Sequence, residues 1–289
     1  MGDGNGWARC DLGHVHWGRF GAAGLLLFHR DPGDGRLRVL LQQRAWWCPG
    51  AGTWGMFGGG RHSHEDPVAA ALRETAEECT LDVRAVRVHG VRTDDHGSWD
   101  FASVIASADR LLDVRPASLE TRKAAWVPVE EVGSRRLFKP FARTWPLLST
   151  MLTRLVLVVD AANVVGARAD GWWRDRAGAN ARLRDDLAVL REGLTGLPDG
   201  VLPYERCFPE VVLVVEGAAR RVAEQPGDGV RVEAASGSGD DHIVDLVTDP
   251  QPDATYLVVT ADRELRARCT AAGASVAGPR WLLSRLPPR

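Results

Sequence analysis

Short hydrophobic runs separated by polar turns dominate the first half of the chain. Five runs rich in aliphatic and β-branched residues predict strands at residues 21–30, 37–44, 83–91, 99–107 and 124–129. A DPGDG turn joins the first two runs, and a helical pattern over residues 141–152 follows the last. The pattern predicts a mixed α+β domain over residues 1–152.

The second half has a different rhythm, in which strands alternate with helices. Predicted strands lie at residues 154–160, 210–217, 230–236, 254–262 and 274–279, and predicted helices at 180–194, 240–247, 263–273 and 280–286. Such alternation is typical of right-handed βαβ units around a parallel sheet. We therefore predict an α/β domain over residues 153–289, joined to the first domain by a few residues near Thr153.

A further predicted helix, over residues 66–79, is the most informative part of the first domain. Asp66 is a good N-cap acceptor, and Pro67 suits the first helical position. The helical period predicts a buried face and an opposite, acidic face. The buried face would hold Val68, Ala71, Leu72, Thr75 and Cys79, and the opposite face Ala70, Glu74, Glu77 and Glu78.

The three glutamates of this helix are spaced i, i+3, i+4, where like charges destabilise a helix by a few tenths of a kcal/mol per pair. A hard divalent cation such as Mg²⁺ would compensate, because it prefers carboxylate oxygens. A solvated acidic face is the alternative for such a run. A glycine-rich segment before the helix, and a single Glu65 placed to pair with Arg73, favour the cation site.

These residues resemble the Nudix box of the Nudix hydrolases: Gly59, five residues, Glu65, seven residues, and then Arg73-Glu74-Thr75-Ala76-Glu77-Glu78. Thr75 departs from the usual aliphatic residue, and Thr80 from a glycine that normally ends the helix in a tight turn. The resemblance implies an α/β/α sandwich with a mixed sheet. It also implies hydrolysis of a nucleoside diphosphate linked to another moiety.

In the same resemblance, Glu74, Glu77 and Glu78 bind Mg²⁺ or Mn²⁺, and the carbonyl of Gly58 assists. Glu77 or Glu78 would orient or deprotonate the attacking water, and Arg73 and Glu65 belong to the same catalytic set. Family subgroups acting on diadenosine polyphosphates, ADP-ribose or NADH carry tyrosine or proline signatures downstream of the box. Both tyrosines lie outside this domain, and no proline lies between Pro67 and Pro116. A nucleoside triphosphate pyrophosphohydrolase is therefore the default prediction.

Neighbouring residues bear on substrate binding. We predict that Gly59, Gly60 and Trp54 contact the nucleotide. The rings of Trp46, Trp47 and Trp54 flank the glycine-rich loop and could stack on a base; the alternative is that at least two of them pack under the loop. Glu120 stands where many family members carry a further acidic residue, although a solvated loop glutamate is as common. Histidines near the motif and near the start of the chain are predicted to be solvated, since a hard cation prefers oxygen. They are His62, His64, His14 and His16.

Acidic residues also gather in the second half, where strands end. Asp160 ends the first strand, Thr260 and Asp262 follow another, and Asp240, Asp241 and Asp245 start a helix. Because the carboxyl ends of parallel strands meet at one edge of the sheet, these groups are expected to share a crevice that suits a divalent cation. No lysine follows Lys139, which argues against a receiver domain or a P-loop kinase, and "DAANVVG" lacks the Asp-x-Asp of a haloacid-dehalogenase phosphatase.

The segments "VVDAANVVG", "GSGDDHIVDLV" and "VVTADRELRARC" together resemble the NYN branch of PIN-like ribonucleases. The resemblance implies a Rossmannoid parallel α/β sheet with Asp160, Asp241, Asp245 and Asp262 as metal ligands. Asn163 and Thr260 would support them. A stretch from residue 171, "GWWRDRAGANARLR", has a composition suited to stacking bases and holding phosphates, and an amphipathic helix with its preceding loop is the alternative.

Composition narrows the partners. The 289 residues carry a formal net charge of −2, so nothing attracts nucleic acid or an anionic membrane globally. Five scattered cysteines without a Cys-x-x-Cys pair predict reduced, mostly buried thiols, and no signal peptide or membrane span is predicted, which favours the cytoplasm. The expected partners are a nucleotide and, through the second domain, single-stranded RNA. The alternative function is RNA 5′-end processing, with the second domain presenting RNA to the first without cutting it.

Overall fold

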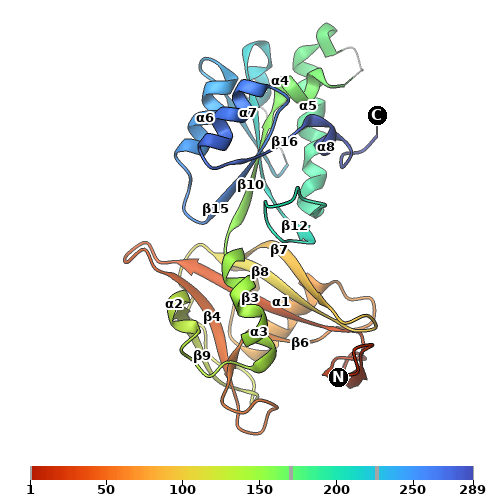
Figure 1. The fold of residues 1–289 in the computed structure, drawn as a ribbon, viewed down its shortest axis with the longest axis vertical. Coiled ribbons are helices and arrows are strands. Elements are labelled where there is room, and N and C mark those ends of the chain that lie inside the picture. The colour runs from red at the N-terminus through yellow and green to blue at the C-terminus, as the bar shows by residue number, and fades with distance from the viewer. Residues whose placement is uncertain (1, 169–171, 225–227, 289) are drawn as a thin grey trace. The chain divides into compact units, whose positions relative to one another are not determined.

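The computed structural model describes residues 2–168, 172–224 and 228–288. By its internal contacts the chain divides into two units, Met1–Leu152 and Thr153–Arg289, which are named unit 1 and unit 2 below. Unit 1 is drawn in red to green in Figure 1, and unit 2 in green to blue. Each unit is described by itself.

Unit 1 is built on a mixed sheet. Its path runs β7-β8-β3-β4-β5, with β6 also paired to β3 and β9 to β4. The central strand β3 pairs in parallel with β8 and antiparallel with β4 and β6. The bounds are β3 Ala22–Arg30, β4 Leu37–Arg44, β5 Trp54–Gly55, β6 Phe57–Gly60, β7 Val86–Asp95, β8 Asp100–Ala108 and β9 Thr121–Pro128. The mixed sheet predicted from the sequence is thus confirmed.

Helices cover both faces of this sheet. Helix α1 (Pro67–Glu78) packs against β3 and β6. Helix α3 (Lys139–Leu148) lies in front of the sheet in Figure 1, and α1 lies behind it. Between two covers the central strand must be apolar on both sides, and residues 22–29 of β3 are indeed all buried. The short elements of the unit are α2 Val129–Val132, η1 Val83–Ala85 and η2 Ser149–Met151.

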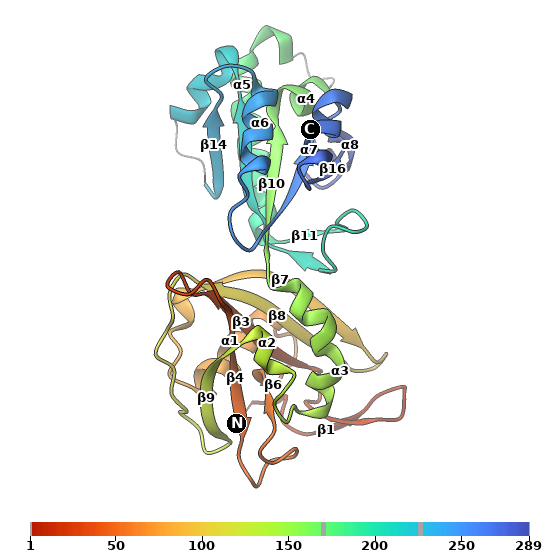
Figure 2. The same ribbon diagram turned by 60° about the vertical axis from the view of Figure 1, so that its left-hand side comes forward.

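Unit 2 is a parallel sheet in the order β14-β13-β10-β15-β16, and Figure 2 shows β14, β10 and β16 in this order from left to right. Every pairing in it is parallel, which confirms the predicted parallel sheet. Its strands are β10 Arg154–Asp160, β13 Glu210–Val215, β14 Val230–Ala234, β15 Ala254–Val259 and β16 Ser275–Ala277, with short β11 Leu194–Thr195 and β12 Arg206–Cys207. Its helices are α4 Ala161–Gly166, α5 Arg176–Leu187, α6 Gly239–Thr248, α7 Arg263–Ala271 and α8 Pro279–Leu283, with η3 Trp172–Arg174, η4 Ala188–Glu192 and η5 Gly217–Glu224.

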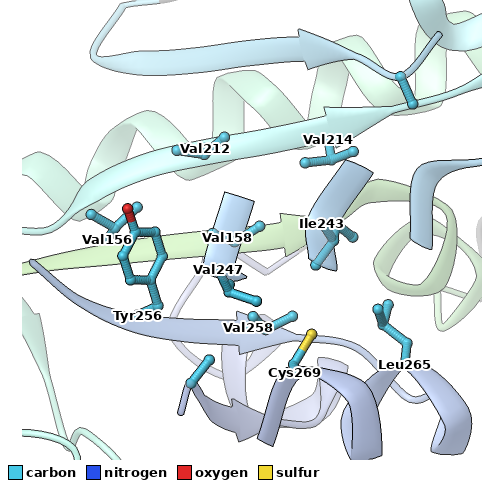
Figure 3. Close-up of a cluster of buried hydrophobic side chains, with 12 residues drawn as sticks. Val156, Val158, Val212, Val214, Ile243, Val247, Tyr256, Val258, Leu265 and Cys269 are labelled. Carbon is cyan, nitrogen blue, oxygen red and sulfur yellow. The ribbon is translucent and has the colours of Figure 1, made fainter. Parts of the chain in front are cut away.

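One face of the parallel sheet packs against α6 and α7. Alternate residues of β10, Val156 and Val158, point to this face and meet Ile243 and Leu265 from the two helices (Figure 3). Intervening residues of β10 are buried as well, since α4 also packs on this strand. A strand covered on both sides reads as a continuous run of β-branched and aliphatic residues, which is why "RLVLVVD" was recognisable.

Several short elements escape the sequence pattern. The hairpin of β1 (Trp7–Arg9) and β2 (Val15–Trp17) has only three residues a strand, and β6 consists mostly of glycine. Three-residue strands show too little alternation to be read, and glycine carries no side-chain pattern. Helix α4 follows Asp160 directly, where the sequence analysis predicted no helix.

The predicted faces of α1 need a correction. Ala70 and Glu78 were assigned to the outer face, but both are buried. The reason is that α1 packs against β6 as well as β3, so its buried face is wider than a single stripe. Among the described residues, none of the helices combines the length and apolar character that crossing a bilayer requires. All five cysteines are free and buried, as predicted.

Candidate active site

Helix α1 begins as the sequence predicts. The side chain of Asp66 accepts a hydrogen bond from the backbone N–H of Val68, and Pro67 occupies the first turn. These two residues fix the first helical residue, and so they fix the direction in which Glu74, Glu77 and Glu78 project two and three turns later.

Arg73 joins the helix to the loop before it. Its Nε and Nη2 atoms each donate to one oxygen of Glu65, both at 2.8 Å, which is a bidentate pair. Nη2 also donates to the carbonyl of Gly60 at 3.1 Å, and Nη1 donates to Glu74 at 2.6 Å. Hydrogen bonds from Arg73 lower the pKa of Glu65 to about 2. The predicted pairing of Arg73 with Glu65 is present, and it links the loop to α1.

Glu78 is the most buried of the three glutamates, with 9% of its surface exposed. Its Oε2 accepts hydrogen bonds from Gln42 Nε2 at 2.9 Å and from the N–H of Gly58 at 3.1 Å. Burial raises the pKa of Glu78 to about 7, despite the opposing hydrogen bond from Gly58; repulsion from Glu74 adds to the rise. A carboxylate stabilised mainly by neutral donors in a buried place would gain strongly from a bound cation.

Glycines let Glu74 approach the sheet. A Cβ atom at Gly59 would lie 2.3 Å from Oε2 of Glu74, so any other residue would displace this carboxylate. At Gly58, φ is +151° and a Cβ would lie 2.2 Å from the carbonyl oxygen of Ala23. Burial also raises the pKa of Glu74. The glycine-rich strand β6 therefore brings backbone and two carboxylates into one small region.

The donors in this region fit a hard divalent cation. Glu74 and Glu78 present oxygen atoms from the side of α1 that faces β6, and Glu77, one turn from Glu74, is exposed at the rim. Carboxylate oxygens are the protein ligands that Mg²⁺ and Mn²⁺ prefer. The three glutamates named as ligands thus lie on one helix beside β6, and the N–H of Gly58 contacts Glu78. A ligand role for the carbonyl of Gly58 stays a prediction.

The end of α1 explains how Thr80 replaces the expected glycine. The cap residue Cys79 is extended, with φ −149° and ψ 169°, and the chain continues by pairing with residues 115–117. Thr80 donates its N–H to the carbonyl of Arg115 and accepts from the Arg115 N–H through its hydroxyl. Because the helix ends in an extended pairing and not in a left-handed turn, a β-branched residue is accommodated.

Comparisons with known proteins agree with this geometry. A family model described as "NUDIX domain" matches residues 19–147. The "Putative 8-oxo-dGTP diphosphatase 3" of Mycobacterium tuberculosis (strain ATCC 25618 / H37Rv) is 42% identical over 155 residues, which cover 52% of this chain and 70% of that protein. The chain belongs to the Nudix family.

A second Nudix relative is matched over only part of its length. The "Nucleoside triphosphate pyrophosphatase/Nudix hydrolase fusion protein" of Bifidobacterium longum (strain NCC 2705) is 37% identical over 155 residues. The match covers 53% of this chain but only 32% of that protein, so the chain spans about a third of its length. Among solved structures, the "Nudix Hydrolase from M. Smegmatis, RenU" is 36% identical, with a TM-score of 0.47, and covers 51% of this chain and 94% of that one.

The predicted substrate contacts of the Nudix unit are only partly arranged as expected. Only 8% of the surface of Trp54 is exposed, and the guanidinium of Arg135 lies 4.7 Å from its ring centroid. The ring of Trp54 is thus packed, and its contact with a nucleotide stays a prediction. Trp46 and Trp47 are the exposed rings. Glu120 is exposed, and its charge contributes to the raised pKa of Glu78, so it lies in reach of the site.

A second cluster lies at the carboxyl edge of the parallel sheet in unit 2. Asp160 is 5% exposed at the end of β10. Its Oδ2 accepts from the hydroxyl of Thr260 at 2.8 Å and from Asn163 Nδ2 at 2.6 Å, and Oδ1 accepts from the N–H of Asn163. Burial is the main cause that raises the pKa of Asp160. Asn163 and Thr260 therefore both contact Asp160, and their support of a metal ligand stays a prediction.

The other acids of this cluster differ from the predicted set. Burial and then repulsion from Asp160, Asp262 and Glu216 raise the pKa of Asp240, which places these four carboxylates in one electrostatic neighbourhood. Asp241 instead pairs with Arg268 at 2.7 Å, with 67% of its side chain exposed. Asp245 is one turn beyond Asp241 on the same side of α6 and is also exposed.

The correction for Asp241 and Asp245 has a simple cause. Helix α6 begins at Gly239, whose N–H donates to Glu216 at 2.8 Å, so residue 240 and not residue 241 turns toward β10. Neighbouring helical residues point about 100° apart, so the side chain that faces β10 depends on how α6 is turned about its own axis, which the sequence alone does not give. Glu216, directly after β13, was missed although it stands at a strand end like Asp160.

The arginine-rich stretch is partly described. Gly171 and the side chain of Trp172 lie outside the described residues, whereas Trp173 is 61% exposed. Arg184 is buried at 9% exposure and contacts Asp185, so it is not on a surface that could hold phosphate.

In the Nudix unit, the sequence analysis did not name Gln42 as a site residue. A glutamine inside an apolar strand that faces a carboxylate helix is the signal that would have found it.

Proposed function

We propose that unit 1 hydrolyses a phosphoric anhydride bond of a nucleoside polyphosphate with the help of Mg²⁺ or Mn²⁺. The observation that carries the proposal is the position of Glu78, buried beside Glu74 and held by Gly58 and Gln42. Nudix family membership supports it, and so do the activities in the relatives' names, a diphosphatase and a pyrophosphatase.

Each residue has a distinct part in this proposal. Glu74, Glu77 and Glu78 would hold the cation, which supplies charge neutralisation and polarisation of the diphosphate. Arg73 and Glu65 keep the loop and the helix in register through their bidentate pair. Within the described residues, the hydrogen bonds to Glu78 go to Oε2, so Oε1 is the oxygen placed to take a proton from the attacking water.

The default substrate class is a nucleoside triphosphate, cleaved to a monophosphate and pyrophosphate. A panel of ribonucleotides, deoxynucleotides and 8-oxo-dGTP would be incubated with the full chain and Mg²⁺, and the released pyrophosphate and phosphate would be quantified separately. We expect pyrophosphate, at a rate that depends on the cation. Release of phosphate alone, or turnover that persists with a chelator, would contradict the proposal.

We also propose a cytoplasmic location, where such nucleotides are found.

For unit 2 we propose a metal-dependent ribonuclease of the PIN-like type. The buried Asp160, with Asp240, Asp262 and Glu216 in its neighbourhood, is the observation that favours this function. Mg²⁺ or Mn²⁺ would there neutralise a phosphodiester, and Thr260 and Asn163 would hold the Asp160 carboxylate in place. A module that binds single-stranded RNA without cutting it, so that a 5′ end reaches the Nudix site, is the alternative.

One assay separates these proposals. Single-stranded RNA with a 5′-triphosphate or a 5′-monophosphate would be incubated with wild type, Asp160→Asn and Glu78→Gln in the presence of Mn²⁺. Internal cleavage that is lost only in Asp160→Asn supports a nuclease. Binding without cleavage, and pyrophosphate release from the triphosphorylated RNA that is lost only in Glu78→Gln, supports 5′-end processing. Failure to bind or cut either RNA would refute both.

A further inference from the structure

Four metal-ligating side chains meet in unit 1, outside the Nudix site. Cys10, His14, His16 and His96 each offer one ligand atom, and these atoms all lie within 4.8 Å of one another. The first three come from the hairpin of β1 and β2, and His96 comes from the turn between β7 and β8. Segments that are about eighty residues apart in sequence are therefore brought to one point by the fold.

The distances between these atoms match those of a four-coordinate site. Nε2 of His16 lies 3.3 Å from Sγ of Cys10 and 3.2 Å from Nδ1 of His96. Zinc at about 2.3 Å from sulfur and 2.0–2.1 Å from nitrogen, in tetrahedral geometry, would place neighbouring ligand atoms about 3.3–3.6 Å apart. The ring of His14 completes the group, with its centroid 6.0 Å from that of His16 and 5.8 Å from that of His96.

Neighbouring groups orient the imidazoles as in metal sites. While Nδ1 of His96 faces the cluster, its Nε2 lies 3.4 Å from a carboxylate oxygen of Asp94. A second nitrogen that donates to a carboxylate is the usual arrangement for a metal-bound histidine. Trp99 stacks on His16, with ring centroids 3.9 Å apart and planes 9° apart, and its own N–H donates to the carbonyl of Gly18. Trp99 thus covers one face of the His16 ring and restricts its rotation, while Nε2 of His16 stays directed at Cys10 and His96.

We propose that Cys10, His14, His16 and His96 form a structural binding site for one zinc ion or a similar borderline divalent metal. The thiol of Cys10 would release its proton to solvent and bind as thiolate, and the three imidazoles would bind in their neutral form. One thiolate with three nitrogens fills a tetrahedral shell, which is typical of a structural site and unlike the carboxylate set of α1. The ion would join the β1–β2 hairpin to the β7–β8 turn.

The prediction that His14 and His16 are solvated rests on the preference of a hard cation for oxygen, which a borderline metal does not share. Three imidazoles and a thiol can also form a hydrogen-bonded group without any metal, and backbone contacts already link the two segments. Asp11 donates its N–H to the carbonyl of His96 at 3.2 Å, and Ser98 donates its N–H to the Asp11 carboxylate at 3.0 Å. The experiment must therefore detect the metal itself.

The test uses the full chain, cleared of metal and then loaded with Zn²⁺ or Co²⁺ in excess Mg²⁺. Bound metal is counted by mass spectrometry after desalting, and the absorption spectrum of the Co²⁺ form is recorded. Cobalt bound by a thiolate gives a sulfur-to-metal charge-transfer band, which carboxylates of the Nudix helix cannot produce. The variants are Cys10→Ser and His14→Ala, the latter at an exposed position where loss of folding is not expected. Cys48→Ser and His62→Ala are the matched controls.

We expect one tightly held zinc per chain and a tetrahedral cobalt spectrum in wild type and in both controls. Cys10→Ser should lose the charge-transfer band, and His14→Ala should weaken zinc binding at least tenfold while its circular dichroism stays unchanged. Zinc should also raise the thermal midpoint of wild type but not of Cys10→Ser. Absence of the band in wild type, or equal binding by wild type and both variants, would overturn the proposal and leave a hydrogen-bonded cluster.

Discussion

The two carboxylate clusters of this chain are assembled in different ways. In unit 1 the acids lie on one helix, α1, at i, i+3, i+4, and a single arginine of the same helix contacts Glu74 and, more distantly, Glu77. In unit 2 they come from the end of β10, the residue after β13, the start of α6 and the start of α7. Helical spacing fixes the first set locally, whereas only the assembled sheet brings the second set together.

Both clusters nevertheless contain the same kind of group. Glu78 and Asp160 are each buried, and each accepts hydrogen bonds from neutral donors: Gln42 and Gly58 in one case, Thr260 and Asn163 in the other. Burial is the largest cause of the raised pKa of both. Neutral donors orient a carboxylate without supplying a positive charge, so a bound cation would stabilise the charged form of both groups.

The largest expected effect is the loss of hydrolysis in Glu78→Gln. This substitution removes the charge but keeps an oxygen that can accept from Gly58 and Gln42. Because the cation supplies several kcal/mol of transition-state stabilisation, we expect kcat to fall on the order of 10²–10³-fold. Steady-state kinetics with Mg²⁺ would measure it.

Glu131→Gln is the matched control, since Glu131 is exposed and pairs with Arg36 away from α1. It should keep the rate of wild type. Normal turnover by Glu78→Gln with unchanged circular dichroism would mean that α1 does not form the active site.

A smaller loss is expected for Arg73→Lys. Lysine keeps the charge but cannot donate to both oxygens of Glu65 and also to Glu74 and Gly60, as Arg73 does. Loss of such orienting contacts typically costs about 10–100-fold in activity or metal affinity. We expect this loss in kcat/KM, with a weaker apparent affinity for Mg²⁺ obtained from a metal titration.

Arg36→Lys provides the comparison for this variant, because Arg36 also contacts two glutamates, Glu130 and Glu131, but on an exposed surface. It should be neutral. Equal activity of Arg73→Lys and wild type over a full Mg²⁺ titration would show that the bidentate hydrogen bonds from Arg73 to Glu65 do not position the site.

Metal binding by the carboxylates of unit 2 tests which residue of α6, Asp240 or Asp241, faces Asp160. In a Glu78→Gln background, which weakens the cation site of unit 1, Mn²⁺ binding would be followed by calorimetry. We expect Asp160→Asn and Asp240→Asn to weaken the remaining binding roughly tenfold, as loss of a ligand or its neighbour does. Asp241→Asn should leave it unchanged, because Asp241 faces Arg268. The opposite ranking of Asp240 and Asp241 would restore the set predicted from sequence.

What the sequence could predict follows from the same contrast. The cap at Asp66, the Arg73 and Glu65 pair and the spacing of the glutamates are local, so they were readable before the fold was known. Strand ends such as Asp160 were readable because parallel strands share an edge. The inward turn of Asp240, the burial of Trp54 and the approach of His96 to Cys10 depend on packing between distant segments. No local pattern encodes these features.

The last expected effect concerns stability without metal, and it isolates the buried charge of Glu78. Its pKa is raised to about 7 in the folded chain, from 4.5. A raised pKa means that the folded state holds the proton more tightly than the unfolded state does. The stability it contributes is therefore complete below pH 4.5 and is lost as the pH rises through 7.

Glu78→Gln cannot lose this proton, so in the presence of a chelator it should become more stable than wild type as the pH rises from 4.5 to 7. The gain should level off above pH 7 at roughly 3 kcal/mol in the free energy of unfolding. Urea unfolding at several pH values would measure it, with the exposed Glu77→Gln as the control that shows no such trend. Added Mg²⁺ should reverse the order, because it binds more tightly to, and so stabilises more, a chain that retains the Glu78 carboxylate. If the difference in stability between Glu78→Gln and wild type does not change with pH, then burial does not disfavour the ionised form of Glu78. The argument for a cation beside it would then fail.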